Sequence, residues 1–300
     1  PNLYIEIIME SEEHTACVRI AYHHTDIVYM SKDQEVLRDV EHEVKEEATQ
    51  GIVCTNRNKM SLQGLLEYAN TIDLAEIKDV IQRQIEMNSR ISQEGLDNAW
   101  GAQIGKTILG NWGHDVRTEA CAAAAAGSDA RMSGCPLPVV INSGSGNQGI
   151  TVTMPALVYA REWKISEEKM YRALLVSNLV SIYIKHYIGA LFAFCGAVSA
   201  ACGSGAAITF MASGDYQHIG RTITNTLANV GGIVCDGAKS SCAAKIAASV
   251  NAALLAHYMS MSDKQFQAGE GIVEQDVEET IKNMGYIGRV GMKSTDKEIL

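Results

Sequence analysis

Two pairs of cysteines with equal spacing stand in the most apolar third of the chain. Each pair is spaced by seven positions, with Cys195 and Cys202 in the first and Cys235 and Cys242 in the second. Thiolates are soft ligands, so such pairs suit an iron–sulfur site that faces a small anionic substrate. The alternatives are thiols that only fill space in the core and, more weakly, disulfides.

Helix geometry reduces the number of ligands that these pairs predict. Alanine and glycine surround Cys195 and Cys202, so we expect one continuous helix there, in which residues seven apart lie about 10 Å apart along the axis. Only one of the two then reaches a shared cluster. An Asp-Gly turn after Cys235 places Cys242 in the first turns of a helix, close enough for both to converge. We therefore predict three ligands.

A polar loop punctuated by glycine precedes these cysteines and supplies backbone donors. The residues of this loop that we predict to bind a substrate are Asn142, Ser143, Gly144, Ser145, Gly146, Asn147 and Gln148. Glycine lets the backbone turn tightly, and a helix that begins near Thr151 would present its positive end to a carboxylate or phosphate. The spacing fits neither a Walker loop nor a dinucleotide fingerprint. An ordinary loop between helices is the alternative.

The composition excludes some classes of protein. The chain has 300 residues and a net charge of −10, which argues against a nucleic-acid surface. Residues 187–214 carry no charge and are long enough to span a membrane. Their small residues instead predict a buried central helix, which could break near Gly203, and no membrane association. No leader-like segment is visible, so we expect a cytoplasmic protein.

Hydrophobic periodicity predicts a mainly α fold in two parts. Alternation over residues 4–9 and 15–30 predicts a β-hairpin, which we interpret as the remnant of a smaller α+β domain at residues 1–32. We assign residues 33–300 to one helical domain that binds the cluster. The clearest predicted helices cover residues 62–68, 74–88, 116–132, 154–163, 167–185, 242–258 and 277–284.

Four ordered blocks of the sequence carry a family resemblance over nearly the whole chain. They are SDARMSGCPLP at 128–138, NSGSGNQGI at 142–150, CDGAKSSCAAK at 235–245 and GIVEQD at 271–276. Together they resemble the L-cysteine desulfidase family, which is akin to the α-chains of iron–sulfur L-serine dehydratases. The resemblance implies a [4Fe-4S] cluster and no pyridoxal phosphate. It also implies β-elimination from a small amino acid, such as L-cysteine to sulfide, ammonia and pyruvate.

The resemblance also implies roles for single residues. The positions that match its cluster ligands are Cys195, Cys235 and Cys242. Cys202 falls outside them and is interpreted as a packing residue. The block at 142–149 resembles the family's substrate loop, and His24 with Thr25 resembles an element on the substrate side of the smaller domain.

One departure from the family concerns a segment that its members usually carry. No Gly-Cys-Thr-Glu-Pro sequence occurs in this chain. We therefore expect either a fragment or a subunit that a separate chain completes. The alanine-rich helical faces favour a homodimer.

Elimination requires a Lewis acid and a base. An iron without a cysteine ligand keeps an open position and can polarise the substrate. The candidates for the base that removes the α-proton are Lys239, His24 and His186, each of which also has a purely structural interpretation. Asp129 and Arg131 predict an ion pair, which either positions the substrate through Arg131 or is structural.

Three other functions stay open from the sequence. The chain could be an L-serine dehydratase-like lyase, in which the leaving group is hydroxyl and not thiol. It could be a non-catalytic subunit or redox sensor that holds a cluster and needs another chain for turnover. It could also bind small anions without a metal.

Overall fold

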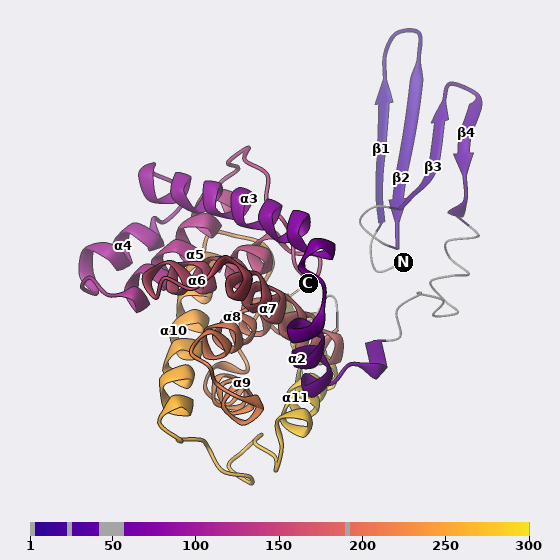
Figure 1. Ribbon diagram of the computed structural model, residues 1–300. Coiled ribbons are helices and arrows are strands. Elements are labelled where there is room, and N and C mark those ends of the chain that lie inside the picture. The colour runs from indigo at the N-terminus through magenta and orange to yellow at the C-terminus, as the bar shows by residue number, and fades with distance from the viewer. Residues whose placement is uncertain (1–3, 23–25, 42–56, 190–192, 300) are drawn as a thin grey trace. The chain divides into compact units, whose positions relative to one another are not determined.

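The computed structural model describes residues 4–22, 26–41, 57–189 and 193–299. The chain forms two compact units, residues 1–59 and 60–300. Strands make up the smaller unit and helices the larger one (Figure 1). The predicted mainly α fold with a small β element at the N-terminus is confirmed.

The smaller unit contains an antiparallel sheet and not a single hairpin. Its strands follow each other in chain order and are β1 (Tyr4–Glu10), β2 (Thr15–Ala21), β3 (Ile27–Lys32) and β4 (Glu35–Asp39). Strand β4 corrects the prediction of helix from residue 33 onward. Asp33 has a φ of 54°, and its carboxylate accepts a hydrogen bond of 2.8 Å from Thr15 N, so the chain turns back and adds a fourth strand.

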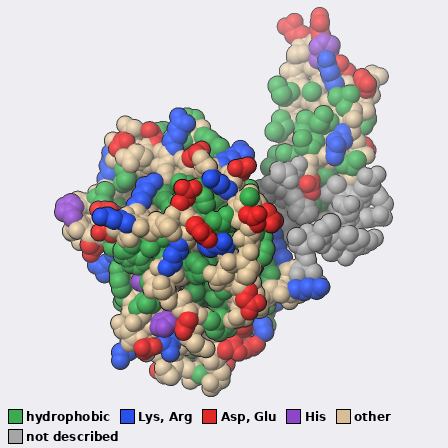
Figure 2. Space-filling model, viewed as in Figure 1, with side chains coloured by type: hydrophobic (Ala, Val, Ile, Leu, Met, Phe, Trp, Pro, Cys, Tyr) green, Lys and Arg blue, Asp and Glu red, His purple; other side chains and the backbone are tan. Residues whose placement is uncertain are grey.

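Both faces of this sheet expose hydrophobic side chains, and one of them also carries an ion pair. On one face Arg19 forms an ion pair of 2.6 Å with Glu6 and stacks over the ring of Tyr29 at 4.5 Å. On the other face Ile7 and Met9 are exposed. Figure 2 shows the hydrophobic side chains gathered along these strands.

The larger unit consists of helices, with longer connections at residues 133–145, 231–241 and 262–276. The helices are α2 (Leu62–Thr71), α3 (Lys78–Asp97), α4 (Ile104–Asn111), α5 (Val116–Met132), α6 (Gly146–Glu162), α7 (Glu167–Ile188), α8 (Gly196–Met211), α9 (Tyr216–Val230), α10 (Cys242–Met261), α11 (Val277–Tyr286) and α12 (Lys293–Ile299). Short turns of other helix types are η2 (Leu74–Glu76) and η3 (Ile287–Gly291), whereas η1 (Arg57–Lys59) belongs to the unit of residues 1–59.

Side-chain caps explain where several of these helices begin. Asp115, Ser166, Asp215 and Asp276 each precede a helix, and the side chain of each accepts a hydrogen bond from the third residue of that helix. Such caps satisfy backbone N–H groups that have no partner within the helix. The predicted start of a helix at residue 167 is confirmed.

Helix α8 lies in the middle of the larger unit, in contact with α6, α7, α9 and α10 (Figure 1). Small side chains make this position possible. A Cβ atom added at Gly203 would lie 2.3 Å from Ser177 O of α7, so a larger residue there would force the two helices apart.

The uncharged stretch at 187–214 is not one helix, which corrects two predictions. Helix α7 ends at Ile188, where Gly189 takes a φ of 104°, and α8 begins only at Gly196. Cys195 therefore lies at the start of α8 and not within a continuous helix, whereas α8 continues without a break past Gly203. In the described part of the chain, no helix is both long and apolar enough to cross a membrane.

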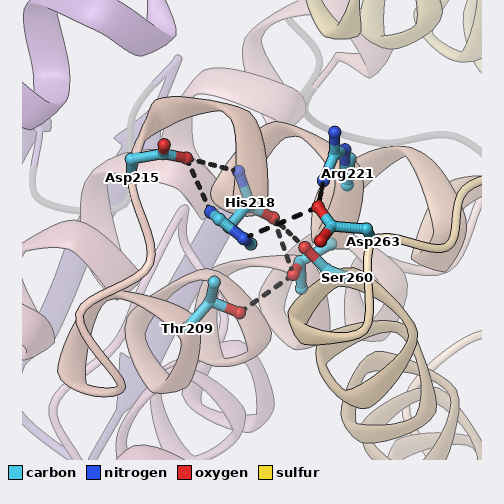
Figure 3. A network of polar contacts seen from close by, with 7 residues as sticks. Thr209, Asp215, His218, Arg221, Ser260 and Asp263 are labelled. Carbon is cyan, nitrogen blue, oxygen red and sulfur yellow. Dashed lines mark hydrogen bonds and ion pairs between the residues drawn. The ribbon is translucent and has the colours of Figure 1, made fainter.

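A polar network joins the ends of α8, α9 and α10 (Figure 3). Asp215 and Asp263 lie on either side of His218, at 2.7 and 4.0 Å, and Arg221 pairs with Asp263. Ser260 Oγ donates to His218 O. The network lies where α8 and α10 end and where α9 begins. It holds these three helix ends together, so we assign it a structural role.

Candidate active site

Two short segments pair and bring the first two cysteines side by side. Phe194 and Val234 form an antiparallel bridge. On either side of it, Cys195 N donates to Ile233 O at 3.0 Å, and Cys235 N donates to Ala193 O at 2.5 Å. The bridge therefore holds residues far apart in the sequence at one place, beside the start of α8.

The thiols of Cys195 and Cys235 share a hydrogen bond, and their pKa values move in opposite directions. The bond from Cys195 lowers the pKa of Cys235 to about 5, against the effect of burial and with help from Gly237 N–H, Lys245 and Lys185. The same bond, together with burial, raises the pKa of Cys195. These shifts favour the thiolate form at Cys235 and the protonated thiol at Cys195.

Cys242 lies at the start of α10, where the prediction placed it. Its Sγ lies 3.8 Å from Gly237 O, in the loop that follows Cys235. Its charge acts on the pKa of Cys195, so the three thiols lie within electrostatic reach of one another. Among the described residues, no three His, Cys, Asp or Glu side chains converge as ligands of a single metal ion.

Three cations surround the thiols. Lys185, in the last turn of α7, is 7% exposed; burial lowers its pKa, while Cys235 and Cys195 act to raise it. Burial disfavours the ammonium of Lys245, but the hydrogen bond and charge of Asp236, together with Cys195 and Cys242, raise its pKa. Arg131, at the end of α5, is within electrostatic reach of Cys242. The site therefore favours anions.

The first half of the predicted substrate loop forms a closed turn. Asn142 and Ser145 exchange backbone hydrogen bonds of 3.1 and 3.0 Å, and Ser143 and Gly144 between them have φ values of 48° and 79°. Asn142 is buried, and its side chain bonds to Asn178 at 3.0 Å. These contacts indicate a structural role for Asn142.

The second half of the predicted loop is helical, which corrects its assignment. Ser145 caps α6, so Gly146, Asn147 and Gln148 occupy the first turn of that helix. The reason is a close approach, because a Cβ atom at Gly149 would lie 1.9 Å from Val140 O. Only glycine allows the helix to start against this strand-like segment.

The start of α6 lies against the start of α8. A Cβ atom added at Gly196 would lie 2.5 Å from the amide of Gln148, which is 7% exposed and whose Oε1 has no hydrogen-bond partner among the described residues. Asn147 Oδ1 accepts a hydrogen bond of 3.4 Å from Arg131. Gln148 therefore lies beside the start of α8, and Arg131 lies beside the first turn of α6.

The other predicted residues lie in varied places. Lys239 is exposed and pairs with Asp236 at 3.2 Å. His186 is half-buried in α7, with its ring 5.3 Å from that of Tyr187. His24 and Thr25 fall outside the described residues. Cys202 is fully buried in the hydrophobic core, in keeping with packing.

The predicted ion pair between Asp129 and Arg131 does not form. Asp129 Oδ2 accepts a hydrogen bond of 3.1 Å from Gly105 N at the start of α4, and burial raises the pKa of this carboxyl group. Residues two apart on a helix point in different directions. The carboxylate therefore stabilises α4, while Arg131 points toward α6.

Sequence reasoning missed two lysines of this site. Lys185 is the one cation in the apolar sequence SIYIKHYIGA, and a charge inside such a run is a usable signal. Lys245 follows Cys242 by three positions, which places both in the first turn of one helix. Neither signal shows that the lysines meet at the thiols, because that depends on the bridge between Phe194 and Val234.

The fold and the site together define a mainly helical protein with a cysteine-based site set between helix N-termini and cations. The chain belongs to the serine dehydratase alpha chain family, whose model matches residues 5–300. Membership of this family indicates a serine dehydratase-like lyase.

Curated relatives support the family and name no substrate. A UPF0597 protein of Desulfitobacterium hafniense is 46% identical over 99% of this chain and 68% of its own length. A UPF0597 protein of Lachnoclostridium phytofermentans is 45% identical over 100% of this chain and 70% of its own length. A third, from Fusobacterium nucleatum, is 41% identical over 100% and 70%. These likenesses support the wider family expected from the sequence and do not single out L-cysteine desulfidases.

Proposed function

We propose that this chain is a [4Fe-4S]-dependent lyase that catalyses β-elimination on L-cysteine, with L-serine as the alternative substrate. Cys195, Cys235 and Cys242 are the ligands in this proposal. The observation that carries it is the bridge at Phe194 and Val234, because it unites two of these thiols beside the third.

The donor set suits a four-iron cluster better than a single metal ion. Each thiolate of such a cluster binds a different iron, so the three sulfurs need not converge on one point. The lowered pKa of Cys235 favours the thiolate form that a cluster ligand needs, and Lys185 and Lys245 offset its negative charge. When bound, the cluster supplies a Lewis acid at the iron that has no cysteine ligand.

The chain's own groups suit the zwitterion of a small amino acid. Lys185, Arg131 and the N-termini of α6 and α8 attract a carboxylate. The unpartnered Oε1 of Gln148 is an acceptor of the kind that an ammonium group satisfies. Charge and hydrogen bonding then orient the substrate with its Cβ substituent toward the thiols.

The reaction breaks the Cα–H and Cβ–S bonds and forms a Cα=Cβ double bond. The electrons of the Cα–H bond become the new π bond, and the leaving thiolate takes a proton to give hydrogen sulfide. The aminoacrylate tautomerises to an imine, which water hydrolyses to pyruvate and ammonia. With L-serine, water leaves in place of sulfide.

The candidates for the base that removes the α-proton differ in their positions in the structure. Lys239 pairs with Asp236 at the surface, which favours its structural interpretation. His186 shares the last turn of α7 with Lys185 and is the described candidate that we propose to test first. His24 remains a candidate from the sequence.

Activity of the reconstituted protein tests this proposal. After anaerobic loading with iron and sulfide, the wild type should release pyruvate from L-cysteine together with sulfide. Cys235→Ser should abolish release, whereas Cys202→Ser, a buried thiol outside the site, should retain it. Pyruvate from L-serine alone would support the alternative substrate.

A second candidate function is a cluster-holding subunit that needs a further region for turnover. The observation in its favour is that the chain spans 68% to 70% of its relatives. Protein with full iron content and no activity, which gains activity when the unmatched part of the D. hafniense relative is added, would support this candidate.

A further inference from the structure

One lysine side chain bonds to both sequence neighbours of Cys235, to the backbone of one and to the side chain of the other. Lys245 Nζ donates a hydrogen bond of 2.9 Å to Val234 O and also bonds to the carboxylate of Asp236. These are the residues immediately before and after the cysteine. We propose that Lys245 is a positioning residue that holds Cys235 in place as a cluster ligand, an inference that rests on the proposed function.

The two bonds of Lys245 help to link the segments that carry the three thiols. Lys245 and Cys242 lie three residues apart on α10, within one turn of that helix. Lys245 therefore attaches the Cys235 segment to the helix that carries Cys242. The bridge between Phe194 and Val234 attaches the same segment to Cys195 from the other side.

The contacts of Lys245 distinguish it from an ordinary surface ion pair. Its side chain is 23% exposed, and it bonds to a backbone carbonyl as well as to a carboxylate. A flexible exposed pair contributes little because both side chains must be ordered and water screens them. A backbone carbonyl is fixed by the fold, so the bond to Val234 restrains the position of the chain itself.

Lys239 is a natural comparison. It binds the other oxygen of the same carboxylate, Asp236 Oδ2 at 3.2 Å, and its side chain is 47% exposed. Within the part of the chain that the structure describes, its side chain makes no hydrogen bond to the backbone beside Cys235. Loss of Lys239 removes one positive charge beside Asp236 and leaves both bonds of Lys245 intact.

Retention of iron tests the proposal in the full chain. The variants are Lys245→Met, Lys239→Met as the matched control and Lys245→Arg as the conservative change. After anaerobic reconstitution, a chelator is added and the decay of visible absorbance is followed. Residues that orient metal ligands change metal affinity by about 10- to 100-fold. We expect Lys245→Met to lose its cluster about tenfold faster than the wild type, Lys239→Met to match the wild type and Lys245→Arg to lie between.

A second readout needs no metal. Mild oxidation of the metal-free protein with diamide should join Cys195 and Cys235 as a disulfide, measured by peptide mapping, because the bridge holds them side by side. Lys245→Met should lower the yield, and Lys239→Met should not. Melting temperatures show which variants are folded; Lys245→Arg supplies the comparison if Lys245→Met is not.

The outcomes separate this inference from the proposed function. Equal decay rates and equal disulfide yields in Lys245→Met and the wild type would overturn the positioning role. The positioning role would also be overturned if Lys239→Met lost its cluster as fast as Lys245→Met. The loss of one positive charge would then explain both results. If the wild type takes up no iron, the proposed function fails. The disulfide yields still test whether Lys245 holds Cys235 in place.

Discussion

At the scale of single residues, the side chains of Cys195 and Cys235 share one hydrogen bond. Their bond lowers the pKa of Cys235 to about 5 and raises that of Cys195. A thiolate held beside a thiol and two ammonium groups is both a good ligand and a good nucleophile. The chemistry of the site thus depends on which sulfur carries the charge.

Selective alkylation of the metal-free protein follows from this asymmetry. At pH 7 iodoacetamide should modify Cys235 before Cys195 and before the buried Cys121, whose pKa burial raises to about 12. The rate at Cys235 should fall as the pH drops through about 5, because the thiolate is then protonated. Peptide mapping by mass spectrometry measures both. A midpoint near the ordinary thiol value of about 8.5 would contradict the hydrogen-bonded pair.

A buried histidine should make stability depend on pH. His257 is 3% exposed, its Nδ1 lies 2.9 Å from Thr209 Oγ1, and burial lowers its pKa to about 4. Below pH 6.5, the ordinary pKa of histidine, His257 is protonated in the unfolded chain and stays neutral in the folded chain down to about pH 4. Stability is therefore lost as the pH falls from 6.5 toward 4.

Replacement by an uncharged residue should remove this dependence. Between pH 7 and pH 4 the free energy of unfolding of the wild type should fall by about 3 kcal/mol more than that of His257→Gln. Urea unfolding at both pH values measures the difference. Parallel losses in the two proteins would show that His257 does not stay neutral in the fold.

At the scale of elements, glycines set how closely the helices approach. A Cβ atom at Gly95 of α3 would lie 1.9 Å from Ala126 O of α5. Gly95→Ala should therefore lower the free energy of unfolding by about 1–3 kcal/mol. Gly110 of α4 is exposed and has nothing within 4 Å of an added Cβ, so Gly110→Ala should raise it by up to about 1 kcal/mol. Equal effects in thermal or urea unfolding would disprove this packing.

The helices that sequence reasoning found are those whose ends carry ordinary signals. Helix α5 matches its predicted bounds, Val116–Met132, because Asp115 caps it and a glycine follows its end. The start of α6 was misplaced because its first turn contains glycines, which usually indicate a loop, and here permit contact with Val140 O. Helix α9 (Tyr216–Val230) was missed, since its threonine-rich sequence is a poor helix former and tertiary packing decides its state.

The thiols and Arg131 of the site were predictable from the sequence, and its two lysines were not. Equal cysteine spacing and the family resemblance named Cys195, Cys235 and Cys242, although the reason given for excluding Cys202 assumed a continuous helix. Lys185 and Lys245 reach the site only through the pairing of Phe194 with Val234. No local pattern announces a bridge between segments forty residues apart.

At the scale of the whole molecule, the described residues of the site all belong to the unit of residues 60–300. A chain that lacks residues 1–59 should therefore fold and take up as much iron as the full chain. Circular dichroism and iron content after reconstitution measure this. A truncated chain that melts cooperatively and binds no iron would show that the smaller unit contributes to the site.

The account depends most on three thiols that hold one cluster. Iron and acid-labile sulfide per chain, measured after anaerobic reconstitution, test this directly. The wild type and Cys202→Ser should contain about four of each, as a [4Fe-4S] cluster requires. The chain with serine at positions 195, 235 and 242 should contain almost none. Equal iron and sulfide in that triple variant and in the wild type would contradict the account.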